Sequence, residues 1–299
     1  MAKHQIGEII DNLYRVTGYL GEGAQSYVYS VSDARRPLAA WALKQLRLED
    51  IPTSEQKVAT EMFAREGLIL KQLHHQALPK LIDCGTPTNE APYIVMERVT
   101  GQPLDEVLDK RSTPLRLEEA LPIALQLTHL LHALHSQKPP IIYRDLKPSN
   151  LILSDSGMIR LIDFGIARFR STGSLKDTQE LGTPGYCAPE QYRGYSSAQS
   201  DLYSLGVVIY YMLTFKDPQS SNFNFPRLDT IIPGVPSPLT DLLTSCLNID
   251  INKRPRSAQE VRRVLFRVLQ NHQTLSSRGT QPLELGLSNL SHHLARLEF

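Results

Sequence analysis

The chain changes its pattern near residue 97, and this change constrains the fold more than any other feature. Residues 14 to 46 alternate β-branched, aromatic and small residues around a pair of glycines, which predicts strands joined by a glycine turn. Residues 54 to 73 have helical spacing, and residues 91 to 101 return to a strand pattern. A small β-rich lobe with one main helix is therefore expected over residues 1 to about 96.

The rest of the chain is mostly helical in pattern. A helix is predicted over residues 117–137, where Pro122 is tolerated only near a first turn. Short apolar runs on either side of residues 154–158 predict two strands. Ser257, with Glu260 three residues later, forms a capping box that opens another helix. The expected fold class is α+β, with a larger and mainly helical second lobe ending near residue 271.

The end of the chain, residues 272–299, carries a separate pattern. Five leucines recur there at spacings of four, three, four and three: Leu283, Leu287, Leu290, Leu294 and Leu297. They form one stripe along a predicted amphipathic helix, although Gly286 weakens the pattern. Docking of this tail on the protein's own body is the expectation, with a partner helix or a membrane surface as alternatives.

Charge and cysteine content narrow the class of protein. Lysine plus arginine (32) nearly balance aspartate plus glutamate (31), so no overall field attracts nucleic acid or an anionic membrane. Three separated cysteines indicate a reducing compartment. The N-terminus has no signal-like apolar run, and the most apolar stretch, residues 202–214, is too short to span a bilayer. A cytoplasmic protein with no nucleic-acid partner and no membrane segment in this chain is expected, although an anchor lost by truncation would give the same pattern.

The stretch "IIYRDLKPSN", residues 141–150, combines groups that handle phosphate and metal. Asp145 can accept or orient a hydroxyl proton, and Lys147 can offset charge on a transferring phosphoryl group. Asn150 and Asp163, the latter at the exit of an apolar strand, supply oxygen atoms of the kind that Mg²⁺ prefers. Alone, each residue also has an ordinary structural explanation, such as a turn aspartate.

A second set of such groups lies in the β-rich lobe. Gly21 and Gly23 in "LGEGAQSYV" would let backbone amides approach a polyphosphate. Lys44, on the expected third strand, would reach the same phosphates, and Glu66 on the following helix would pair with it. The ordinary alternatives are turn glycines, a surface lysine and a solvated glutamate.

Together these motifs resemble those of eukaryotic-type (Hanks-type) serine/threonine protein kinases, in the family's order over about residues 14 to 270. "GEGAQSYV" matches the glycine-rich loop with Ser26 for the third glycine, "WALK" matches V-A-I-K, and "YRDLKPSN" matches H-R-D-L-x-x-x-N with Tyr143 for histidine. "DFG" and "APE" are intact. The catalytic loop is similar to that of bacterial members, which favours a bacterial source. The resemblance implies a bilobal protein-kinase fold that binds ATP between its lobes.

The resemblance assigns a role to each matching residue. Asp145 would be the catalytic base and Lys147 the γ-phosphate contact. Asn150 and Asp163 would hold Mg²⁺, with Mn²⁺ as an alternative ion. The implied ATP pocket consists of Leu20, Gly21, Gly23, Val28, Ala42, Lys44, Met96, Glu97, Val99 and Ile152. In this pocket the side chain of Met96 would be the gatekeeper, and backbone groups of Glu97 and Val99 would hydrogen-bond the edge of the adenine.

Supporting roles are implied as well. Tyr143 would pack behind Phe164, a task that an aromatic ring can perform in place of histidine. Asp201 would hold the backbone of the catalytic loop, and Glu190 and Arg254 would form a buried ion pair.

Substrate class and regulation come from the same resemblance. Lys147 is the residue expected in kinases for serine and threonine, and Thr183 would contact both Asp145 and the acceptor site. Arg144 would receive a phosphate from the activation loop. The candidate acceptors are Ser171, Thr172, Ser174 and Thr178, of which Thr178 is preferred.

The expected activity is therefore ATP-dependent phosphorylation of protein serine and threonine, with autophosphorylation. A pseudokinase scaffold would lack at least one of four central residues, but all four are present: Lys44, Asp145, Asn150 and Asp163. A kinase-fold phosphotransferase for small molecules would lack the "GTPGYCAPE" platform that supports a peptide, which is also present.

Overall fold

The computed structural model describes most of the chain in separate stretches. The described residues are 3–23, 25–33, 35–86, 91–164, 168–169 and 182–276.

The chain divides into two compact units, and each is described by itself. The first comprises Met1–Thr100 with Ile162–Gly165, and the second comprises Gly101–Leu161 with Ile166–Phe299. The first is rich in strands and the second is mainly helical, as the change of pattern along the sequence predicts. The predicted α+β class is confirmed.

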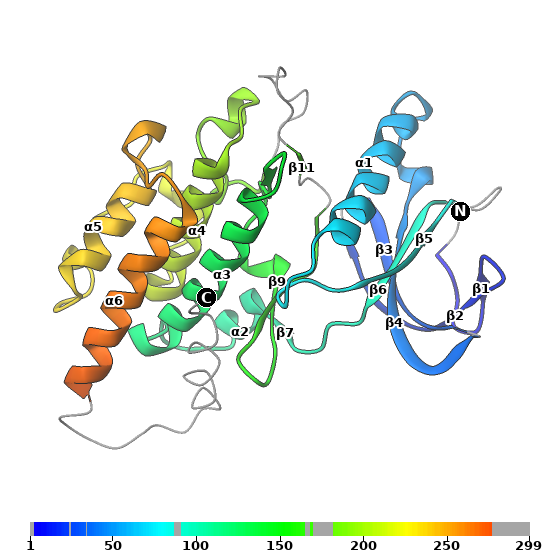
Figure 1. Cartoon of the computed structure of the whole chain (residues 1–299), viewed down its shortest axis with the longest axis horizontal. Coiled ribbons are helices and arrows are strands. Elements are labelled where there is room, and N and C mark those ends of the chain that lie inside the picture. Colours follow the sequence, from blue (N-terminus) through cyan, green and yellow to red (C-terminus); the bar gives the residue numbers. More distant parts are fainter. Residues whose placement is uncertain are drawn as a thin grey trace. The chain divides into compact units, whose positions relative to one another are not determined.

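One antiparallel sheet of six strands forms the frame of the first unit, in the order β1-β2-β3-β4-β6-β5 (Figure 1). The strands are β1 (Ile9–Ile10), β2 (Tyr14–Gly23), β3 (Ser26–Asp33), β4 (Arg36–Leu46), β5 (Leu81–Gly85) and β6 (Tyr93–Glu97). The predicted strands and the glycine turn between the first two of them are confirmed, since Gly23 pairs with Ser26 across that turn. β1 and β5 are additional to the prediction.

A single long helix, α1 (Thr53–Gln72), packs against this sheet and confirms the predicted helix. Its buried residues include Phe63, Glu66 and Leu70, which recur at the three- and four-residue spacing of one helix face. On the same face Gly67 lies against the side chain of Ile94 in β6. The helix thus brings a carboxylate onto the face that it presents to the strands.

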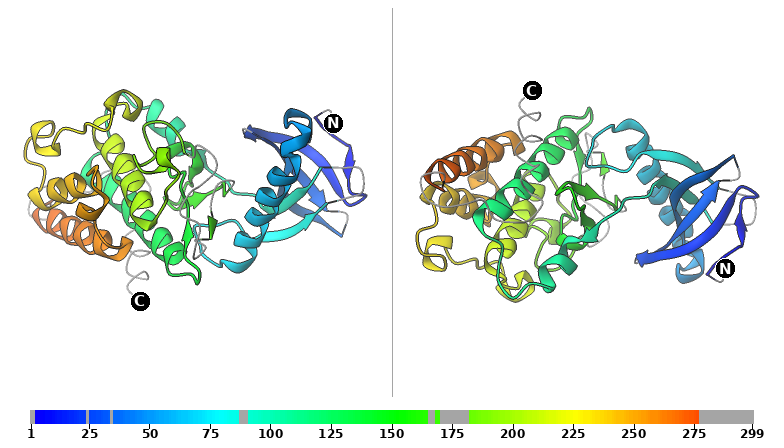
Figure 2. Two further views of the ribbon diagram at one scale, coloured as in Figure 1. Left: turned by 90° about the horizontal axis from the view of Figure 1, so that it is seen from above. Right: turned by 90° about the horizontal axis from the view of Figure 1, so that it is seen from below.

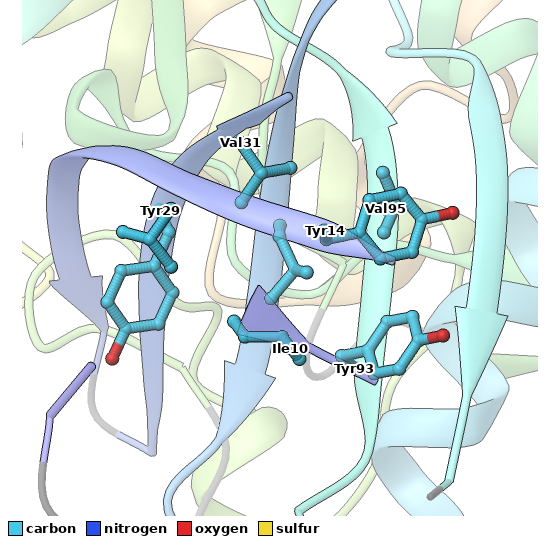
Figure 3. Packing of buried hydrophobic residues seen from close by; sticks show 8 residues of the cluster. Ile10, Tyr14, Tyr29, Val31, Tyr93 and Val95 are labelled. Atoms are coloured by element: carbon cyan, nitrogen blue, oxygen red, sulfur yellow. The ribbon is translucent and has the colours of Figure 1, made fainter. Parts of the chain in front are cut away.

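The opposite face of the sheet carries a core with three tyrosines. Figure 3 shows Ile10, Tyr14, Tyr29, Val31, Tyr93 and Val95 packed together. The rings of Tyr14 and Tyr93 meet edge to face with centroids 5.7 Å apart. Their hydroxyls donate to Asp83 at 2.5 Å and to Asp11 at 2.6 Å, so the polar tips are satisfied while the rings are buried.

Helices build the second unit. They are α2 (Leu104–Asp109), α3 (Leu117–His135), α4 (Ala198–Thr214), α5 (Ser237–Cys246) and α6 (Ala258–Ser276). α3 contacts α4 and α6, and α5 contacts both α4 and α6 (Figure 2). α4 contains the most apolar stretch of the sequence and is buried from Ser200 through Tyr210, which confirms the predicted core helix. Gly206 allows its close approach to α5, because a Cβ there would lie 2.8 Å from that of Cys246.

Short strands and single helical turns complete the chain. β7 (Gln102–Pro103), β9 (Leu151–Leu153) and β10 (Ile159–Leu161) form a three-stranded sheet, while β8 (Ile141–Ile142) pairs with β11 (Arg168–Phe169). The short 3₁₀ helices are Leu48–Asp50, Pro148–Asn150, Gln191–Arg193, Pro218–Ser221, Leu228–Thr230 and Ile251–Lys253. β9 and β10 confirm the two strands predicted around residues 154–158.

Two local predictions hold in part. Pro122 lies in the second turn of α3 and not in the first. The side chain of Ser257 accepts the N–H of Glu260 at 3.2 Å, as a capping box requires, but the Glu260 carboxylate accepts the N–H of Arg256 instead of that of Ser257.

The predicted tail helix lies outside the described residues. Every described helix falls short of the combined length and hydropathy that a membrane span requires.

Candidate active site

Three charged groups of the first unit meet at Lys44. The Nζ of Lys44, on β4, lies 2.9 Å and 2.7 Å from the two carboxylate oxygens of Glu66 on α1. It also lies 2.7 Å from Oδ1 of Asp163. The N–H of Phe164 donates to Glu66 at 3.4 Å, so the same glutamate contacts the segment that carries Asp163.

Burial and pairing set the charge state of this cluster. Desolvation alone would lower the pKa of Lys44, but the carboxylates of Asp163 and Glu66 outweigh it and hold the pKa above its usual range. Burial raises the pKa of Glu66 from its usual value, against the attraction of Lys44. Lys44 therefore remains an ammonium over the whole physiological pH range.

Four of the residues expected around a nucleotide share one face of the sheet. Val28 pairs with Lys44, and Ala42 pairs with Met96. Since side chains directly opposite each other lie on the same face and alternate along a strand, these four point to the side opposite the tyrosine core. Ala42 and Met96 are buried, and Leu20 is exposed.

The structure bears on one of the predicted backbone contacts to adenine, that of Glu97. The N–H of Glu97 donates to the carbonyl of Lys80 at 2.8 Å, so this N–H is already engaged within the protein. Val99 is partly exposed, and Gly21 lies opposite Val28 in the glycine turn. Ile152 lies on β9 in the second unit, where it is 8% exposed.

In the second unit, the residues of the predicted catalytic loop form a closed network with Thr183. The Thr183 hydroxyl donates to Oδ1 of Asp145 at 2.7 Å and accepts from Nζ of Lys147 at 2.6 Å. Lys147 lies 2.9 Å from Oδ2 of Asp145. The amide of Asn150 donates to the carbonyl and to Oδ2 of Asp145, at 2.9 Å and 3.0 Å. Three residues from two loops thus converge on the carboxylate of Asp145.

The backbone of this loop is anchored from α4. Fully buried Asp201 accepts the N–H of Tyr143 at 2.9 Å and that of Arg144 at 2.7 Å. The sequence did not indicate His135, whose Nε2 lies 2.8 Å from the same carboxylate. Arg144 has a φ of 76°, a left-handed conformation that such anchoring can hold. The predicted packing of Tyr143 behind Phe164 joins residues of different units and stays a prediction.

A buried ion pair joins the end of the predicted acceptor platform, residues 182–190, to the helices. Arg254 lies 2.7 Å and 2.9 Å from the two carboxylate oxygens of Glu190, a bidentate arrangement. Ser200 on α4 adds a hydroxyl that donates to Glu190 at 2.7 Å.

The platform itself, residues 182–190, requires glycine at one point. Gly185 has a φ of 84°, and a Cβ there would lie 2.6 Å from the backbone nitrogen of Gln219. Only glycine fits this conformation and this approach. The sequence also gave no signal for Gln191, whose side chain contacts the catalytic loop.

The expected metal ligands have suitable donor atoms. The amide nitrogen of Asn150 donates to Asp145, so the amide oxygen is the atom of this side chain that could bind a metal ion. Asp163 has a carboxylate that is 41% exposed. An amide oxygen and a carboxylate are hard ligands that suit a divalent cation such as Mg²⁺. The four candidate phosphate acceptors, including Thr178, lie outside the described residues.

Comparison with known proteins identifies the class. The model of the protein kinase domain family matches residues 14–266, so the chain belongs to that family. The chain is 30% identical over 270 residues to a protein of Lactococcus lactis named probable serine/threonine-protein kinase PknB, covering 86% of this chain and 42% of that protein.

Two further bacterial relatives carry the same kind of name. Serine/threonine-protein kinase PknL of Mycobacterium tuberculosis is 31% identical, over 80% of this chain and 61% of its own length. Serine/threonine-protein kinase A of Synechocystis is 29% identical, over 86% of this chain and 53% of its own. The chain thus spans between about two fifths and three fifths of the length of these relatives.

Proposed function

We propose that the chain is an ATP-dependent protein kinase that phosphorylates serine and threonine hydroxyls of protein substrates. The observation that carries this proposal is the contact of Thr183, on the acceptor platform, with both Asp145 and Lys147. A hydroxyl that replaces Thr183 as a ligand of Asp145 would be held by a base on one side and an ammonium on the other. The family match and the names of the relatives support the same conclusion.

In the proposed reaction the acceptor oxygen forms a bond to the γ-phosphorus of ATP, and the bond from that phosphorus to the β,γ-bridging oxygen breaks. Asp145 orients the acceptor hydroxyl and takes its proton, while Lys147 offsets charge on the transferred group. Lys44, held extended by Glu66, would bind the α- and β-phosphates.

A divalent ion would complete this machinery. Asn150 and Asp163 would hold Mg²⁺, or Mn²⁺ as an alternative, and the ion would neutralise phosphate charge. The adenine would lie against Val28, Ala42, Met96 and the other predicted pocket residues, with the Glu97 carbonyl as an acceptor for its amino group.

The wider assignments are also part of this proposal. The kinase domain would occupy residues 1–271, with a boundary between its lobes near residue 97. The protein would act in the cytoplasm and autophosphorylate at Thr178, with Arg144 as the receiving cation. Residues 272–299 would form a tail that docks on the domain or on a partner.

Transfer assays with Asp145→Asn test the proposal directly. Purified protein is incubated with Mg-ATP and a generic protein acceptor, and phosphosites are mapped by mass spectrometry. We expect Ser and Thr phosphorylation that falls at least about a hundredfold in the variant, the scale of a lost general base. Nucleotide binding should be retained.

Asp155→Asn, an exposed aspartate in the turn between β9 and β10, is the matched control and should be fully active. Phosphate on tyrosine alone would refute the substrate class. Equal silence of wild type and variant, also after treatment with an upstream kinase, would favour a scaffold. Transfer to small molecules without transfer to proteins would favour a kinase-fold phosphotransferase that acts on small molecules.

A further inference from the structure

We infer that Gln191 is a positioning residue for phosphoryl transfer, an inference that rests on the proposed kinase function. Its side-chain amide ties the acceptor platform to the peptide bond that immediately precedes the base, Asp145. Gln191 is the first residue of a 3₁₀ turn after "APE" and is 1% exposed.

The amide of Gln191 bridges two loops that are far apart in sequence. Its Nε2 donates to the carbonyl of Arg144 at 3.0 Å. Its Oε1 accepts the N–H of Ala188 at 2.9 Å. Ala188 is fully buried and belongs to the platform, whereas Arg144 belongs to the catalytic loop. One end of the side chain therefore holds each loop.

The bond to Arg144 fixes the direction of the following residue. The Arg144 carbonyl belongs to the planar peptide unit whose nitrogen is that of Asp145, so holding the carbonyl oxygen holds the plane from which the Asp145 side chain departs. Arg144 has a left-handed φ of 76°, a conformation that persists only where neighbours determine it. Asp201 holds the N–H of Arg144 and Gln191 holds its carbonyl, so the residue is fixed on both sides.

A second contact shows why the platform and the loop must keep register. Thr183 on the platform donates to Asp145 at 2.7 Å, which joins the same two loops at the side-chain level. Gln191 joins them at the backbone level. The Thr183 and Gln191 bonds together would align the acceptor with the base. Gln191 is therefore inferred to position the reacting groups as well as to pack in the core.

The chain supplies a matched control in Gln126 on α3. This glutamine is also buried, its Nε2 donates to the carbonyl of Gly157 at 3.0 Å, and its Oε1 accepts the N–H of Ile159 at 2.9 Å. It bridges backbone groups in the same way but holds the turn between β9 and β10. Loss of either amide should cost similar stability, whereas only Gln191 should affect turnover.

The test compares Gln191→Met with Gln126→Met, each of which keeps the side-chain length and removes the amide. We expect kcat for a protein acceptor to fall between about tenfold and a hundredfold in Gln191→Met, the scale of a misplaced reacting group. The KM for ATP should stay within about twofold. Gln126→Met should lower the thermal midpoint by a similar amount and keep the wild-type kcat per folded molecule.

Parallel behaviour of the two variants, with kcat per folded molecule unchanged in both or reduced equally in both, would overturn the inference. Should Gln191→Met not fold, Gln191→Asn against Gln126→Asn is the second pair, because a side chain shorter by one methylene cannot span both loops. Wild-type turnover in Gln191→Asn would likewise overturn it. A wild-type protein that transfers no phosphate would instead overturn the proposed function itself.

Discussion

Replacing Arg254 by methionine should destabilise the helical unit strongly, because it leaves a carboxylate without its buried counter-ion. Arg254 is 4% exposed and makes two short hydrogen bonds to Glu190. Its guanidinium also donates to three backbone carbonyls, those of Asn248, Gln199 and Ile249. The variant therefore loses a bidentate ion pair and the donor to three backbone carbonyls.

The size of the effect follows from this geometry. Removing one partner of a buried ion pair costs about 3–5 kcal/mol. The Glu190 side chain is 17% exposed and keeps the hydrogen bond from Ser200, so it retains some solvation. We therefore expect a loss near the lower end, about 3 kcal/mol in the free energy of unfolding. The double variant Glu190→Gln/Arg254→Met should recover part of the loss, because no charge is then stranded.

Denaturant unfolding followed by circular dichroism measures the loss, with Arg227→Met as the control. Arg227 also pairs with two aspartates, at 2.9 Å and 3.2 Å, but about half of its side chain is exposed. Its removal should leave the midpoint unchanged within error. A loss below about 1 kcal/mol in Arg254→Met, the value of an exposed pair, would refute the reasoning.

Three further predictions concern other groups. Alkylation of the native protein should modify exposed Cys84 within minutes but not buried Cys246, because burial raises the pKa of the Cys246 thiol to about 12. Peptide mass spectrometry measures both adducts, and early modification of Cys246 would contradict the prediction. Asp33→Asn should reduce stability at pH 7, because Arg35 holds the pKa of Asp33 below its usual range. The difference from wild type should begin to shrink below about pH 4, the usual pKa of an aspartate, and disappear once the pH falls below the lowered pKa of the folded state. A difference that does not shrink in acid unfolding curves would contradict this. Tyr143→Phe and Tyr143→His should both stay active, because the bond that the hydroxyl accepts from Asn150 is long, at 3.3 Å, and an aromatic ring is retained; a severe loss of kcat in a folded variant would assign the tyrosine a further role.

Elements with their own side-chain period were predictable from sequence, and elements that depend on a partner were not. α1 and the strands from residue 14 to 46 carry a helical or alternating pattern that each segment shows alone. β5 reads "LIDCG", with Asp83 at its centre, and becomes a strand by pairing with β6. The two residues of β1 are too few to show any period, although Ile10 is fully buried in the tyrosine core.

The same distinction applies to the site. Asp145, Lys147 and Asn150 carry their chemistry within a contiguous motif, so their identity and spacing could be predicted before the fold. The side chain of Gln191 bonds to Arg144, which is 47 positions earlier in the chain, and His135 bonds to Asp201, which is 66 positions later. No local pattern in the sequence indicates such distant contacts. The hydrogen bond from the N–H of Glu97 to the carbonyl of Lys80 could likewise not be predicted, because it depends on where the fold places Lys80.

The anchoring of the catalytic loop by Asp201 has a consequence for hydrogen exchange. The amide hydrogens of Tyr143 and Arg144 belong to a loop, yet both are bonded to a carboxylate that is fully buried on α4. Their exchange with solvent requires an opening that separates the loop from the central helix. These two amides should therefore exchange with the slow core of the helical unit, and their protection would report the integrity of that core from within the reaction centre.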